Sequence, residues 1–159
     1  MSDLFSRFHH ICIVVSDIDR SVAAYESIGI GPWNDMSALP PITEFTIDGE
    51  AAELAGGFRY REAHVDGVAI RLCEPPEGDS PQRRFLDTKG QGVFHVGFAV
   101  DDIVAADTEV TQALGLSAYI RGRRSDGSGW THFDTSEKFG VLLELRQSPA
   151  AKSADLQDA

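Results

Sequence analysis

The sequence predicts an α+β fold made of two tandem βαβββ modules, and an internal repeat is the main reason for this prediction. Residues 9–17 (HHICIVVSD) align with residues 94–102 (FHVGFAVDD), which pairs His10 with His95. Each of these segments alternates like a half-buried strand, and a helical pattern follows it. We therefore expect a duplicated unit whose functional site lies where the two halves meet.

A second pair of similar segments closes each half. Residues 68–75 (VAIRLCEP) match residues 141–149 (VLLELRQSP), and this places Arg71 where the other half has Glu144. A chain of 159 residues can form one domain with a real core but is too short for two independent ones. We expect one structural domain, with modules at 1–75 and 93–148, a linker with a short helix at 76–92, and a disordered tail at 149–159.

Turn residues divide the first half into its elements. Asp66 and Gly67 are the pair expected at a two-residue hairpin turn, and in that register Glu62 lies opposite Arg71. The strands and helix expected in this half are a strand at 9–15, a helix that begins near residue 18 with Ile18, Val22 and Tyr25 on one face, a short strand at 43–47, and hairpin strands at 58–65 and 68–74.

The second half repeats this order. Its helix is expected at 103–114, with Ile103, Ala106, Val110 and Leu114 as the buried stripe. The basic segment RGRR at 121–124 reads as a loop, with the alternative that it holds an anionic group of a substrate. The other elements expected are a helix at 82–89, a strand that begins after Gly92, and strands near 129–134 and 139–147.

Composition excludes several classes of protein. The net charge of −11 leaves no clustered basic face for nucleic acid. No apolar run approaches the ~20 residues that cross a bilayer, and no signal peptide is recognisable, so we expect a cytoplasmic protein without a membrane partner. Cys12 and Cys73 both fall in predicted strands and are expected to be buried free thiols.

Strand parity gathers a set of metal ligands. Side chains alternate across a strand, so His10 and His95 share the face turned away from the helices, and Glu144 has the same parity in the last strand. Two neutral imidazoles and one carboxylate suit a divalent metal and leave positions open for substrate or water. We expect Co, Mn, Ni, Zn or Fe at this site.

Several motifs resemble the vicinal oxygen chelate superfamily, which includes glyoxalase, bleomycin-resistance proteins and extradiol dioxygenases. They are HHICIVVSDID, GPW, EPPEGDSPQRRFLDTKGQGVFHVGFAVDDI and KFGVLLELRQ, and they are most similar to the methylmalonyl-CoA epimerase branch. The resemblance implies an incomplete eight-stranded barrel with its helices outside, a homodimer, and metal ligands at positions 10, 71, 95 and 144. Three positions match, but Arg71 stands where the epimerases carry Gln or Glu, and arginine cannot ligate a cation.

The role of Arg71 is therefore open between two interpretations. It forms a cross-strand ion pair with Glu62, or it binds a substrate carboxylate or phosphate. The general base is also open among Glu44, Glu50, Glu53 and Glu62, with Glu62 preferred by parity. His64 is a further candidate for a ligand or base, and the residues expected to contact substrate, besides Arg71, are Trp33, Tyr60, Trp130 and His132.

Three functions follow from these residues. The first is a metal-dependent epimerase, isomerase or lyase that acts through an enolate on a small carbonyl substrate, with an acyl-CoA as the class that the resemblance implies. The second is an Fe(II) ring-cleaving dioxygenase, because that chemistry uses two histidines and one carboxylate. The third is a non-catalytic protein that sequesters a ligand, as bleomycin-resistance proteins do.

Overall fold

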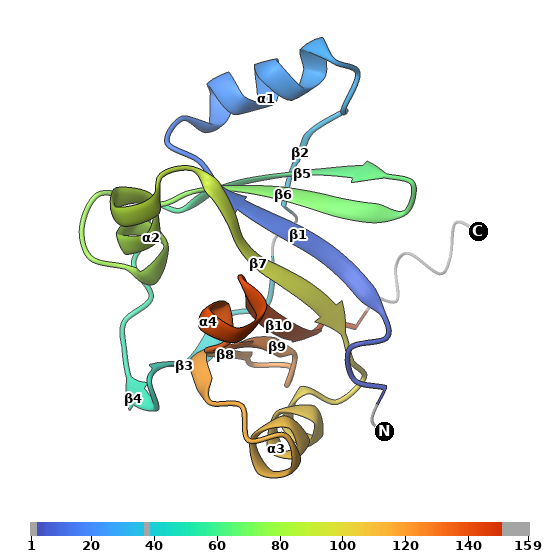
Figure 1. Ribbon diagram of the computed structural model, residues 1–159, viewed down its shortest axis with the longest axis vertical. Coiled ribbons are helices and arrows are strands. Elements are labelled where there is room, and N and C mark those ends of the chain that lie inside the picture. The colour runs from blue at the N-terminus through green and yellow to red at the C-terminus, as the bar shows by residue number, and fades with distance from the viewer. Residues whose placement is uncertain (1–2, 37–38, 151–159) are drawn as a thin grey trace.

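The structure, a computed structural model, describes residues 3–36 and 39–150. The described strands form one mixed sheet in the order β2-β5-β6-β1-β7-β10-β9-β8-β3-β4, and its two edges do not pair, so the barrel stays open (Figure 1). The strands are β1 (Phe8–Val14), β2 (Asn34–Asp35), β3 (Ile42–Ile47), β4 (Glu50–Ala51), β5 (Arg59–Val65), β6 (Val68–Glu74), β7 (Gly92–Ala99), β8 (Ala118–Arg124), β9 (Gly129–Phe133) and β10 (Leu142–Gln147). The helices are α1 (Ile18–Ser27), α2 (Pro81–Lys89), α3 (Ile103–Ala113) and α4 (Ser136–Phe139).

The seam between the halves is the antiparallel pair of their first strands, β1 and β7, which run side by side through the middle of the molecule (Figure 1). On either side of this seam the last strand of each half lies parallel to the first, β6 beside β1 and β10 beside β7. The predicted α+β fold with an open barrel is therefore confirmed. The division of the chain into modules at 1–75 and 93–148 stays a prediction, and residues 151–159 of the expected tail lie outside the described residues.

The β5–β6 hairpin has the predicted register. Glu62 is opposite Arg71, and the turn is made by Asp66 and Gly67 with φ values of 51° and 79°. Both residues occupy the left-handed region, which is the requirement of the two-residue turn whose twist matches the strands. This turn fixes which side chains of β5 and β6 face the inside of the barrel.

Strand β3 departs from a simple duplication. It belongs to the first half of the sequence, yet it pairs antiparallel with β8 of the second half, with Phe45 opposite Gly122. Beside β5 the edge is occupied instead by the two-residue strand β2. The chain therefore crosses from one half of the sheet to the other between β2 and β3, and this crossing brings β3 side chains to the inner face of the barrel.

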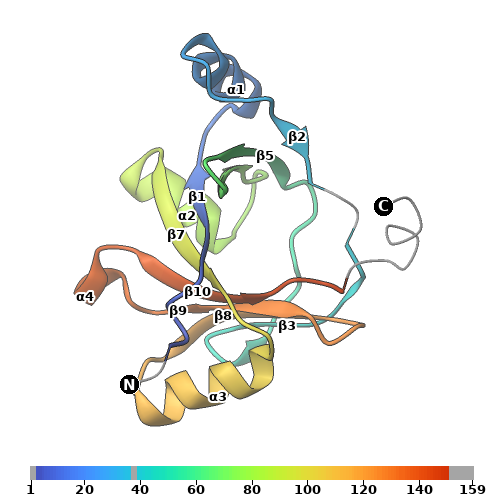
Figure 2. The same cartoon turned by 90° about the vertical axis from the view of Figure 1, so that its right-hand side faces the viewer.

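Helices α1 and α3 lie outside the sheet at opposite ends of the molecule, and α2 and α4 lie between these ends (Figures 1 and 2). Helix α1 buries the predicted face with Ile18, Val22 and Tyr25 against the first half. Helix α3 buries Ile103, Ala106 and Val110, but Leu114 is 50% exposed, because the helix ends one residue earlier and Leu114 is its C-cap. The described helices include none that is long and apolar enough to cross a membrane.

The basic segment 121–124 is not a loop as expected, but part of β8. Its side chains alternate across the sheet, so Arg121 and Arg123 both face α3 and bind the buried Asp107, at 2.6 and 2.8 Å from its Oδ2. Arg124 points to the opposite side and lines the interior of the barrel. Only one arginine of this segment is therefore available to the cavity.

Candidate metal centre

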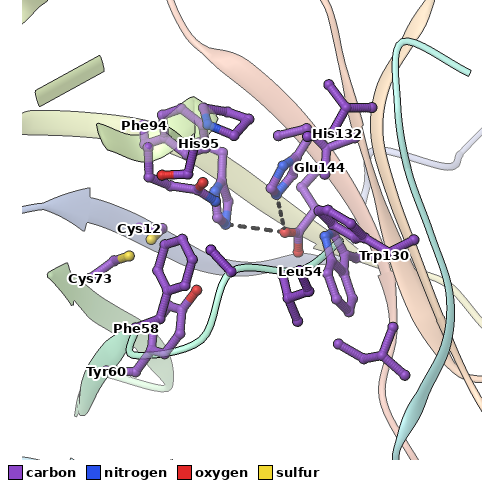
Figure 3. Close-up of a pocket in the computed structure, with 18 of the residues that line it drawn as sticks. Cys12, Leu54, Phe58, Tyr60, Cys73, Phe94, His95, Trp130, His132 and Glu144 are labelled. Atoms are coloured by element: carbon purple, nitrogen blue, oxygen red, sulfur yellow. Dashed lines mark hydrogen bonds and ion pairs between the residues drawn. The ribbon is translucent and has the colours of Figure 1, made fainter. Parts of the chain in front are cut away.

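His10, His95 and Glu144 come together inside the barrel, one from each of the strands β1, β7 and β10. Figure 3 shows two of them, His95 and Glu144, side by side. Their ligand atoms all lie within 4.8 Å of one another. The two imidazole Nε2 atoms are 2.8 Å apart, and the Glu144 carboxylate lies 3.1 Å from His95 and 3.5 Å from His10. The exposed fractions of these three residues are 0%, 7% and 2%, so the cluster is closed to bulk water.

Gly97 makes this convergence possible. In the sheet it lies opposite His10 on one side and Glu144 on the other. A Cβ atom at position 97 would stand 2.2 Å from Cε1 of His10, far closer than atoms of two side chains can approach. The imidazole therefore occupies the space that any other residue at position 97 would fill.

Burial keeps the two imidazoles neutral. Desolvation lowers the pKa of His95 to about 3, and it lowers the pKa of His10 as well. Burial opposes ionisation of Glu144, yet the adjacent His95 and His10 hold its pKa well below the ordinary value. The cluster is thus two neutral nitrogen donors beside one carboxylate, which is the protonation state that metal binding requires.

The donor spacing fits a divalent ion. Ligand atoms about 2.1 Å from a first-row metal stand roughly 3 to 3.5 Å from one another, and the observed separations of 2.8, 3.1 and 3.5 Å are close to this range. Oε1 of Glu144 is buried and accepts no hydrogen bond within the described part of the chain. The residues present therefore suit a metal bound by two histidines and one carboxylate.

Arg71 occupies the fourth corner of the cluster. Its Nη1 lies 3.4 Å from Nε2 of His10, and its Nε donates a short hydrogen bond to Glu62. Of the two interpretations of Arg71, the structure therefore shows the cross-strand ion pair with Glu62. Because one side of the guanidinium is held by Glu62, the group is fixed beside the candidate metal position.

His132 supports the carboxylate from β9. It stands opposite Glu144 in the β9–β10 ladder, and its Nε2 lies 2.6 Å from Oε2 of Glu144 (Figure 3). Its ring is also close to that of His95, with centroids 4.3 Å apart. A partner of this kind orients a metal-binding carboxylate.

A cavity of about 360 Å³ opens in front of the cluster. Of the residues expected to contact substrate, four line it: Tyr60, Arg71, Trp130 and His132. Trp33 lies outside, packed on Tyr25 of α1 and donating a hydrogen bond to the carbonyl of Ile30.

Of the remaining candidates for a metal ligand or a general base, only some line the cavity. His64 is exposed and lies 3.6 Å from Glu62, and neither side chain lines the cavity. Of the other glutamates considered, Glu53 lines the cavity, whereas Glu44 and Glu50 do not.

Two further arginines, Arg124 and Arg146, are buried and line the cavity. Arg146 was missed from the sequence, whereas Arg124 belongs to the segment 121–124, for which binding of an anionic substrate group was the alternative to a loop. Burial and the neighbouring Arg71 lower the pKa of Arg146 to about 10. A signal for Arg146 was present, because it has the same strand parity as Glu144. Arg124 could not be found in this way while its segment was taken for a loop.

Replacing Gly97 tests the packing of His10. The Gly97→Ala variant is expected to bind Co²⁺ at least tenfold more weakly than the parent protein, because the new methyl group displaces the imidazole. Gly92→Ala is the matched control on the same strand, where the nearest atom is the Phe85 ring at an ordinary 3.8 Å. Calorimetric titration measures both, and equal affinities in the two variants would contradict the packing.

Acid should destabilise the metal-free protein through the buried histidines. Between pH 6.5 and about 3 the unfolded chain protonates His95 whereas the folded protein keeps it neutral, so the free energy of unfolding falls as the pH falls. The loss is about 1.4 kcal/mol per pH unit for each such histidine, with His10 acting in the same direction. Urea unfolding of chelator-treated protein at pH 7, 6 and 5 measures the slope. His95→Gln should make it shallower, and an unchanged slope would show that His95 is not held neutral.

Comparison with known proteins places the chain in a family. The family model described as the Glyoxalase/Bleomycin resistance protein/Dioxygenase superfamily matches residues 9–133. The uncharacterized protein YqjC of Bacillus subtilis (strain 168) is 27% identical over 145 residues, which are 88% of this chain and 91% of that protein.

Solved structures of methylmalonyl-CoA epimerases have the same fold. The enzyme from Mycobacterium tuberculosis superposes with a TM-score of 0.67 at 23% identity, over 98% of this chain and 95% of its own. A variant of the Streptomyces coelicolor enzyme, solved in complex with 2-nitronate-propionyl-CoA, gives a TM-score of 0.63 at 27% identity, over 91% and 98%. The protein therefore belongs to the glyoxalase/bleomycin resistance/dioxygenase superfamily, also called the vicinal oxygen chelate superfamily.

Proposed function

We propose that the protein is a metal-dependent enzyme of the epimerase, isomerase or lyase type, which moves a proton next to the carbonyl of a small substrate. The observation that carries this proposal is the buried cluster of His10, His95 and Glu144 at the inner end of an enclosed cavity. Membership of the superfamily supports it, as does the likeness to a methylmalonyl-CoA epimerase at 27% identity.

His10, His95 and Glu144 would hold the ion next to the carbonyl oxygen of the substrate. A divalent metal, when bound, supplies a Lewis acid that polarises a carbonyl and makes the adjacent proton more acidic. His132 fixes the orientation of the Glu144 carboxylate, and the ion pair with Glu62 holds Arg71 beside the same point. The side chains of the cluster are buried, so their charges act at low dielectric.

A carboxylate at the cavity is needed to accept the proton. Glu62 has the expected strand parity, but its carboxylate is engaged by Arg71. Glu53 lines the cavity, and its carboxylate forms no hydrogen bond or ion pair with the described residues. We propose that Glu53 is the base that accepts the proton, and that Glu62 fixes the position of Arg71.

A second candidate function is ring cleavage by an Fe(II) dioxygenase. It is favoured by the set of two histidines and one carboxylate, since Arg71 removes the fourth ligand that the epimerases have. The aromatic side chains along the cavity, such as Phe58 and Trp130, also suit a ring-shaped substrate. Binding of an aromatic ligand without catalysis fits the same wall and is the third candidate.

We further propose that the protein acts in the cytoplasm as a homodimer. Cys12 and Cys73 support a reducing compartment, because both are buried free thiols on neighbouring strands. The pKa of the Cys12 thiol is raised by its hydrogen bond with Cys73 and by burial, which keeps it protonated and unreactive. The homodimer rests on the family resemblance.

Metal content tests the cluster. Protein purified without chelator or nickel resin is expected to hold near one equivalent of a divalent metal, and His95→Ala and Glu144→Ala should each lose it because a three-ligand site tolerates no deletion. His64→Ala is the control, since that side chain is exposed and outside the cavity, and should keep the metal. Elemental analysis that finds equal metal in all four proteins would contradict the ligand assignment.

Solvent exchange tests the reaction. In D₂O, the metal-loaded protein should introduce deuterium next to the carbonyl of a 2-oxo acid or of a thioester such as methylmalonyl-CoA, followed by mass spectrometry. Glu53→Gln should slow the exchange at least about 100-fold while metal content is unchanged, because removal of a general base has effects of that size. Oxygen uptake with catechol by an iron-loaded protein, without exchange, would favour the dioxygenase instead.

A further inference from the structure

Two arginines inside the cavity form no ion pair with any described residue. Arg124 on β8 and Arg146 on β10 are only 6% and 8% exposed. Nε and Nη1 of Arg124 and Nε of Arg146 are buried without a hydrogen bond to any described residue. Neither side chain forms an ion pair in the described part of the chain, whereas Arg71 is paired with Glu62. Buried charges are normally paired, so these two call for a partner that the described residues do not provide.

The sheet sets both arginines on one wall, around Trp130. Arg146 is opposite Trp130 in the β9–β10 ladder, and Trp130 is opposite Gly122 in the β8–β9 ladder. The indole lies across Gly122, since a Cβ there would be 2.3 Å from its ring. Arg124, two residues further along the same face of β8, has its guanidinium carbon 5.1 Å from the centre of the indole. The indole therefore packs against the guanidinium of Arg124, and its strand β9 lies between the two strands that carry the arginines.

The charges along the cavity do not cancel. Glu144 belongs to the metal cluster, and its carboxylate contacts His95 and His132. The other acidic residues that line the cavity, Glu53 and Asp79, are exposed at its rim. The inner wall thus carries two guanidinium groups with unused hydrogen-bond donors, in a protein whose net charge is −11. Such a wall attracts an anion and selects against a neutral or cationic ligand.

We infer that Arg124 and Arg146 form an oxyanion-binding subsite, which receives a carboxylate or phosphate on the end of the ligand away from the metal cluster. Guanidinium groups bind these anions through paired hydrogen bonds, and the free Nε atoms are the donors available for them. The inference rests on the proposed function only in placing the reacting end of the substrate at the metal cluster. Phe58, Phe94 and Ile120 also line the cavity, so the substrate class is a small acid with an apolar body.

Binding of 3-phenylpropanoate, its amide and 2-phenylethylphosphonate tests the subsite. The carboxylate or the phosphonate should bind at least tenfold more tightly than the neutral amide, and whichever binds better identifies the oxyanion. This preference should disappear in Arg146→Met and in Arg124→Met. It should persist in Arg20→Met, a control on exposed helix α1, far from the cavity. Equal affinity for acid and amide, or a preference that survives in the double variant, would overturn the inference.

Two further measurements separate this inference from a structural role and from the proposed function. In the absence of ligand, Arg146→Met should not lower the melting temperature, because it replaces an unpaired buried charge by an apolar side chain. A loss of stability in that variant would show that the arginine holds the fold together instead. The anion preference should also remain in chelator-treated protein, so it can be found even if the metal proposal fails.

Discussion

The architecture depends on the close approach of His10 to the backbone of Gly97. The first strands of the two halves pair across the seam, and the imidazole from one lies where a side chain of the other would stand. This approach places Nε2 of His10 2.8 Å from Nε2 of His95 and within reach of Glu144. The two histidines that correspond in the repeat therefore meet at a single site on the seam.

Charge divides the interior into two regions. Around the cluster, neutral imidazoles and one carboxylate offer a site for a cation, with Arg71 neutralised by Glu62 beside it. Beyond Trp130, Arg124 and Arg146 offer a site for an anion. The two regions share one cavity, which Phe58, Phe94 and Ile120 also line, so it suits a ligand that carries an anionic group on an apolar body. This gradient orients the substrate before any chemistry occurs.

The sequence was sufficient for the features set by local pattern. Strand parity placed His95 and Glu144 on the inner face, and the Asp-Gly turn gave the hairpin register that pairs Glu62 with Arg71. Features set by long-range pairing were not predictable. The position of β3 beside β8 depends on which open edge a short strand meets, and no local residue encodes that choice. The side of the sheet that Arg124 faces was not predictable for the same reason, since it is defined only once β8 is part of the sheet.

X-ray absorption at the cobalt edge of Co²⁺-loaded protein tests the central claim most directly, because it reports the ligands of the ion themselves. The account predicts two imidazole ligands and oxygen donors at about 2.1 Å. It also predicts that one imidazole is lost in His10→Ala, the residue that the first half contributes. A spectrum without imidazole scattering, or one that His10→Ala leaves unchanged, would contradict a metal centre shared between the two halves.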